Sequence, residues 1–128
     1  MLKRFALVFL ALLLVACQSD GARQLEESRD LLCDVLEAVD ELMFARFGAD
    51  SSYLRPELDE LEKEISSSDD QAALDAIAED GFASTVGYCL FLSQTPPPRW
   101  AEVLAPLAED HPQAWERYST LLDGLVAD

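Results

Sequence analysis

The sequence predicts an all-α protein, a single small bundle of about five to six helices. Apolar residues recur at three- and four-residue steps along most of the chain. Gly and Pro separate these stretches where helices are expected to begin and end. A strand-like run has no second strand to pair with, and a lone strand is unstable. At 128 residues, the chain suits one domain with one core.

The longest predicted helix covers residues 23–47. Acidic residues fill most positions opposite its apolar stripe, which is the pattern of a helix with one buried side. Gly48 follows directly and is the expected stop. The predicted stripe comprises Leu25, Leu32, Val35, Leu36, Val39, Leu42, Met43 and Phe47.

A second helix is predicted after the polar turn at residues 50–52. Pro56 suits its first turn, where a missing N–H costs little. The apolar stripe is narrow, so this helix should lie on the surface with one side in contact. The stripe comprises Leu54, Leu58, Leu61 and Ile65.

A third helix is expected to begin at a capping box formed by Ser68 and Gln71. It should run to about Glu79, and Gly81 should end it. Its inward positions are Ala73, Leu74 and Ile77.

Residues 82–94 fit either a fourth helix or a buried strand, because periodicity cannot decide a run this short. The lack of a pairing strand favours the helix. Prolines 96–98 then form a stiff link. A fifth helix follows from Trp100, with Pro106 expected to kink it or split its last turn.

The sixth helix is expected to start at Pro112, just after an exposed turn that contains His111. Its apolar positions step by three and four residues, like those of the first helix. They are Trp115, Tyr118, Leu122, Leu125 and Val126.

The N-terminus has the order of a secretory signal. Lys3 and Arg4 precede an apolar run over residues 5–16, which is shorter than the roughly 20 residues of a membrane span. The run ends in Leu14-Val15-Ala16-Cys17, which resembles the lipobox of bacterial lipoproteins. The resemblance implies diacylation of Cys17, cleavage before it and acylation of its new amine. An ordinary secretory signal with a coincidental cysteine, or a retained membrane helix, is the alternative.

The signal divides the chain into a cleaved segment, residues 1–16, a lipidated tether, residues 17–22, and a helical domain, residues 23–128. In lipoproteins with this kind of signal, Asp directly after the Cys favours retention in the inner membrane. Gln18 stands there instead, which implies the periplasmic face of the outer membrane. Asp20 leaves the inner membrane open.

Export also bears on the two remaining cysteines, Cys33 and Cys89. An even pair in an oxidising compartment usually forms a disulfide, and we expect one here. Two free buried thiols are the alternative.

The chain is strongly acidic, with 25 Asp and Glu against 9 Lys and Arg, a net charge of −16. Such a surface repels nucleic acid and anionic head groups, so the lipid must hold the protein at the membrane. A partner protein should be basic rather than acidic. Alternatively, the charge serves only to keep the domain soluble.

The sequence holds no recognisable catalytic motif, and we expect a protein that is not an enzyme. The single His111 lies in a turn, and the cysteines lack metal-site spacing, so no metal or cofactor is expected. Large side chains crowd the end of the first helix, as in surfaces that receive a partner. These candidate partner-binding residues are Met43, Phe44, Phe47 and Tyr53. The groove beside the fourth helix is a second candidate, and a role in the core is the alternative.

In size, helix content, lipobox and cysteine pair, the protein resembles the pilotins of type II secretion. That resemblance implies a non-enzymatic lipoprotein that binds another envelope protein. No pilotin motif is matched, so no binding residue follows from it. The alternatives are an inhibitor or immunity-type lipoprotein that binds a basic enzyme, a structural envelope lipoprotein, and an enzyme acting on wall or lipid.

Overall fold

The structure, a computed structural model, describes residues 2–126, with the side chains of residues 21–50, 52 and 54–126. The predicted fold class is confirmed: the described residues form helices and no strand. The elements are α1 (Leu2–Phe47), the 3₁₀ segment η1 (Gly48–Leu54), α2 (Arg55–Ser66), α3 (Gln71–Ile77), the π-helical η2 (Ala78–Val86), α4 (Gly87–Leu92), α5 (Pro97–Asp110) and α6 (Pro112–Gly124).

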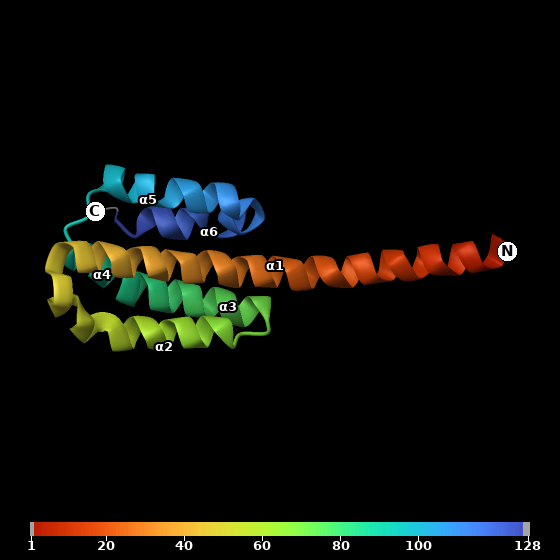
Figure 1. Ribbon diagram of the computed structural model, residues 1–128, viewed down its shortest axis with the longest axis horizontal. Coiled ribbons are helices and arrows are strands. Elements are labelled where there is room, and N and C mark those ends of the chain that lie inside the picture. The colour runs from red at the N-terminus through yellow and green to blue at the C-terminus, as the bar shows by residue number, and fades with distance from the viewer. Residues whose placement is uncertain (1, 127–128) are drawn as a thin grey trace.

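The helix α1 lies in the middle of the bundle (Figure 1). The pair α2 and α3 covers one side of it, and the pair α5 and α6 covers the other. The side chain of Cys17 and the predicted signal peptide lie outside the described side chains. Where side chains are described, no helix is both long enough and apolar enough to cross a bilayer.

The apolar stripe of α1 forms much of the core, as its spacing predicts. Val35 and Val39 are fully buried, and Leu31, which the predicted stripe omits, is buried with them. Gly48 follows α1 with φ +59°, a left-handed conformation that glycine adopts without steric cost. The predicted end of the first helix is therefore confirmed.

The predicted stop at Gly81 is wrong. Helical backbone continues from α3 through η2 into α4, so residues 71–92 form one unbroken helical stretch. A Cβ on Gly81 would lie 2.5 Å from Cδ1 of Leu61 on α2. The glycine thus serves the close packing of two helices instead of ending one. The helical reading of residues 82–94 is confirmed over residues 82–92.

The predicted capping box is also wrong. Asp70 caps α3, with Oδ1 accepting a hydrogen bond from the Ala72 amide at 2.9 Å. Ser68 is buried and its hydroxyl has no partner, while the Gln71 side chain turns toward α6. Asp70 directly precedes α3 and supplies an acceptor for a free N–H of the first turn, so the Ser68 hydroxyl is not needed as the cap.

The last two helices pack through a buried tryptophan. Trp100 of α5 is 1 % exposed, and its Nε1 donates to the Leu122 carbonyl of α6 at 2.7 Å. The helix α5 is not split at Pro106 and runs to Asp110. Pro106 is exposed, so the carbonyl that it leaves without an amide partner can bond to water.

The expected disulfide is absent, and Cys33 and Cys89 are free thiols. Cys33 lies beside α2, with Sγ 3.8 Å from the Ser66 hydroxyl. Cys89 is fully buried in the core. The two side chains therefore have different surroundings, Cys33 at the contact of α1 with α2 and Cys89 inside the core.

Candidate functional site

The structure divides the predicted partner-binding residues between core and surface. Met43 is 1 % exposed and belongs to the core, which corrects its assignment to a binding surface. Phe44 is 64 % exposed and Phe47 is 37 % exposed. The Tyr53 side chain lies outside the described side chains.

Phe44 is exposed because of its register on α1. The exposed side of the helix repeats at steps of four and three residues, and Phe44 continues a row of carboxylates. We call this row, with Phe44 at its end, the acidic face of α1. It comprises Asp30, Asp34, Glu37, Glu41 and Phe44.

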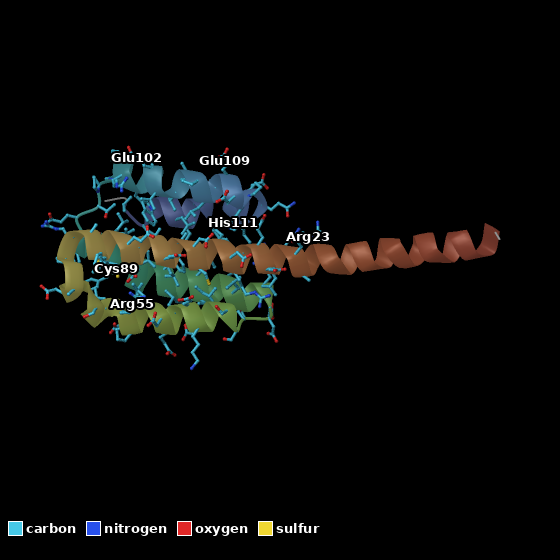
Figure 2. All side chains as sticks on the ribbon, in the orientation of Figure 1. Arg23, Arg55, Cys89, Glu102, Glu109 and His111 are labelled. Carbon is cyan, nitrogen blue, oxygen red and sulfur yellow. The ribbon has the colours of Figure 1, made fainter. Side chains whose placement is uncertain are left out.

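Phe47 lies one turn beyond Phe44, and the polar side chain of Arg46 lies over its ring. The Arg46 guanidinium lies 5.9 Å from the centroid of the Phe47 ring, within range of a cation–π contact. Arg46 Nη2 also donates to Gln94 Oε1 at 3.3 Å, which ties the end of α1 to the residues after α4. Both phenylalanines lie in the last turn of α1, far along the helix from Arg23, which is labelled in Figure 2.

A groove runs along each side of the acidic face. The α1–α5 groove has a volume of about 380 Å³, and the α1–α2 groove about 280 Å³. Asp34 and Glu37 contribute to both. Glu102 of α5 and Arg55 of α2 lie on opposite sides of α1 (Figure 2).

The groove predicted beside the fourth helix exists as a hollow of about 360 Å³. Leu90 and Phe91 of α4 line it together with Leu125 and Val126. Phe91 is 77 % exposed and Tyr88 is half exposed. The sequence does not single out either aromatic residue as exposed, because the apolar run that contains both also fits a buried strand.

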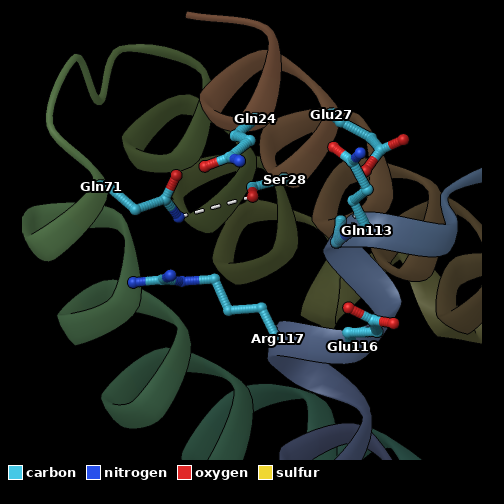
Figure 3. A pocket seen from close by; sticks show the side chains of 8 residues that line it. Gln24, Glu27, Ser28, Gln71, Gln113, Glu116 and Arg117 are labelled. Atoms are coloured by element: carbon cyan, nitrogen blue, oxygen red, sulfur yellow. Dashed lines mark hydrogen bonds between the residues drawn. The ribbon is translucent and has the colours of Figure 1, made fainter. Parts of the chain in front are cut away.

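A polar pocket of about 430 Å³ lies where α1, α3 and α6 meet (Figure 3). The amide of Gln71 donates to the buried Ser28 hydroxyl at 3.4 Å and to the Tyr118 hydroxyl at 2.9 Å. Arg117 and Glu116 of α6 complete the wall. No sequence signal indicated this cluster, because its hydrogen bonds join residues more than 40 positions apart.

Asp75 organises the groups next to this pocket. Arg117 binds it through two nitrogens, Nε donating to Oδ1 at 2.9 Å and Nη2 pairing with Oδ2. The Tyr118 hydroxyl donates to Oδ1 at 2.6 Å. The Arg117 guanidinium, with the Tyr118 and Gln71 hydrogen bonds, lowers the pKa of Asp75 to about 2. Burial, with the Asp75 carboxylate, raises the pKa of Tyr118 to about 12.

His111 is not the exposed turn residue that the sequence predicts. Its side chain is 14 % exposed, and Nε2 lies 2.8 Å from Asp34 Oδ2. Nearby, Glu27 accepts a hydrogen bond from the Ala114 amide at 2.7 Å. Two carboxylates of α1 thus hold the start of α6. His111 has a structural partner there, and no nucleophilic side chain is among its hydrogen-bond partners.

No family model, no curated protein and no solved structure matches this chain. Among the described residues, no group of His, Cys, Asp and Glu could hold a metal ion. The polar pocket's main groups bind one another. By contrast, the acidic face of α1 presents carboxylates and a phenyl ring to solvent, so its arrangement suits binding of a partner.

Proposed function

We propose that this protein is a lipid-anchored lipoprotein of the bacterial outer membrane, without enzymatic activity, that binds another envelope protein. The inner membrane is the alternative location. The observation that carries the binding role is the exposed Phe44 at the end of a row of carboxylates on α1. Phe47 lies one turn further along α1 and is also exposed, and neighbouring exposed aromatic side chains are typical of an interaction site.

The anchoring part of the proposal rests on residues 14–17, which resemble a lipobox. Diacylation and amine acylation of Cys17 would supply several acyl chains, enough for stable attachment. The intact mass of the protein purified from membranes tests this. We expect residues 17–128 plus acyl mass. An unmodified Cys17, or retention of residues 1–16, would remove the anchor from the proposal.

The partner-binding part of the proposal describes an adaptor, which holds or delivers another protein in the envelope, as the resemblance to pilotins suggests. Phe44 and Phe47 lie in the last turn of α1. Arg23 lies more than five turns earlier on the same helix, on the side where the tether would attach (Figure 2). A partner could therefore reach Phe44 and Phe47 without displacing the anchor.

Site-specific photo-crosslinking in intact cells tests the binding part. A photoreactive residue replaces Phe44 in one variant and Glu60 in a matched control. Both positions are exposed, and Glu60 lies on α2 outside both grooves. We expect one specific envelope protein to crosslink at position 44 and not at position 60. The same pattern at both positions, or no adduct at 44, would contradict the proposal.

A second candidate function is inhibition of a basic enzyme that enters the periplasm. The acidic face and its grooves favour it, since opposite charge speeds and orients such binding. The two functions separate in the same experiment. An adaptor crosslinks a resident protein in growing cells, whereas an inhibitor crosslinks only when the basic enzyme is added.

A further inference from the structure

We infer that the α1–α5 groove is a docking site for a basic amphipathic helix of the partner protein. This inference rests on the proposed function, because it names the chemistry of that partner. It also places the contact along α1, so that Phe44 becomes one end of a longer surface.

The groove has an apolar floor. It is lined by Ala38 of α1 and by Val103, Pro106 and Leu107 of α5. Pro106 is exposed, and the other three are half-buried. Covering this floor would remove apolar surface from water, which favours association. The lining residues of α1 run from Asp34 to Glu41 and those of α5 from Arg99 to Leu107, so the groove follows about two turns of each helix.

The rim of the groove is acidic. Asp34, Glu37 and Glu41 stand on the α1 side, and Glu102 stands on the α5 side. Arg99, the basic residue in the lining, pairs with Glu102 at 3.2 Å. Among the described side chains, Glu37 and Glu41 have no ion-pair partner. A partner with lysine or arginine beside its apolar residues would neutralise them.

The spacing fits a helix. Glu37 and Glu41 are one turn apart, and Asp34 to Glu41 spans about 10 Å along α1. Basic residues three and four positions apart on an α-helix have the same spacing. Phe44 continues the row and would meet an apolar residue one turn further on. A metal ion is not the occupant, since no described group of ligands could hold one.

Binding of a synthetic 18-residue peptide to the full chain tests the charge requirement. The peptide is an amphipathic helix with a leucine stripe flanked by lysines three and four positions apart. E37K/E41K removes two rim carboxylates, and E60K/E64K makes the same charge change on the outer side of α2. At about 0.15 M salt, remote charges are largely screened. We expect E37K/E41K to weaken binding about tenfold or more and E60K/E64K to weaken it less than about threefold.

Filling the floor tests the groove without a change in charge. Ala38→Trp would block it, and Ala76→Trp adds the same bulk on the exposed side of α3. We expect Ala38→Trp alone to weaken peptide binding, by about tenfold. Circular dichroism establishes which variants fold, and E37Q/E41Q replaces E37K/E41K if the latter does not. Equal losses in a variant and its matched control would overturn the inference.

The same variants in cells separate this inference from the proposed function. We expect E37K/E41K to abolish the crosslink at position 44, and E60K/E64K to preserve it. A crosslink that survives E37K/E41K would overturn the groove inference and leave the partner-binding function standing. No crosslinked partner in the unmodified background would overturn the proposed function itself.

Discussion

Among the described side chains, Asp75 has more hydrogen-bond partners than any other carboxylate. It receives Arg117 and Tyr118 from α6 and Gln71 from its own helix. The side chain is 29 % exposed, so water weakens these interactions only in part. The contacts join α3 to α6, two helices that are distant in sequence, and we expect them to stabilise the bundle.

Asp75→Asn should lower the free energy of unfolding at pH 7 by about 1–2 kcal/mol, because it replaces the ion pair with weaker hydrogen bonds. The native pKa of about 2 lies below the ordinary value of 3.8. The carboxylate therefore stabilises the fold fully above pH 4 and loses this effect as the pH falls from 4 to 2. Urea unfolding of both proteins at several pH values measures the difference.

The matched control is Asp80→Asn, which changes an exposed carboxylate by the same atoms. It should leave stability within about 0.5 kcal/mol of the parent at pH 7. A constant gap between Asp75→Asn and the parent from pH 7 down to pH 2 would show that ionisation of Asp75 does not stabilise the fold.

The two thiols should differ in reactivity. Burial raises the pKa of Cys89 to about 11 and also raises that of the half-buried Cys33. Thiolate is the reactive form, and Cys89 is also shielded from the reagent. We expect Cys33 to be alkylated first at pH 8 and Cys89 only on unfolding, as peptide mass mapping would reveal. Two thiols that stay unreactive in denaturant without a reductant would instead establish a disulfide.

At the scale of single elements, the start of α3 gives a direct test of capping. Asp70→Ala should destabilise the protein by about 1 kcal/mol, because the Ala72 amide loses its acceptor. Ser68→Ala should cost less than about 0.5 kcal/mol, since the Ser68 hydroxyl has no partner to lose. Thermal unfolding of the two variants measures both. The reverse order would restore Ser68 as the cap.

The sequence predicts the buried sides of helices better than it predicts where helices begin and end. Repeating apolar steps identify the buried side of α1 and α2 because a helix places such residues on one side. Gly81 could not be read correctly, because a glycine that ends a helix and one that admits Leu61 look alike in sequence. The choice between Ser68 and Asp70 likewise depends on the direction in which the chain leaves α2.

For the whole molecule, charge should set the response to salt. A net charge of −16 makes the folded state repel itself, and the described side chains form few ion pairs in return. Raising NaCl from 10 to 300 mM should therefore increase the melting temperature by at least ~2 °C, since salt screens the repulsion. E60K/E64K, with four fewer net negative charges, should respond less. A melting temperature that falls with salt would mean that attraction between charges dominates.

The candidate surface was only partly predictable from the sequence. The crowding of large side chains at the end of α1 did not distinguish Phe44 and Phe47, which are exposed, from Met43, which is buried. Exposure depends on which neighbours cover each residue, and those neighbours come from distant segments. The lining of the hollow beside α4 could not be predicted from the sequence, because residues 125–126, which line it together with Phe91, are distant along the chain.

By itself the sequence determined the helical class, the end of α1 at Gly48, the buried side of α1 and α2, the acidity of the chain and the expectation of an exported, lipidated protein. These follow from local spacing, from composition and from a short contiguous signal. Only the tertiary structure decided that Cys33 and Cys89 stand apart, that His111 binds Asp34, and that a groove with an acidic rim lies beside α1. The physical reason is that these features depend on how helices distant in sequence pack, and periodicity within one helix does not specify its neighbours.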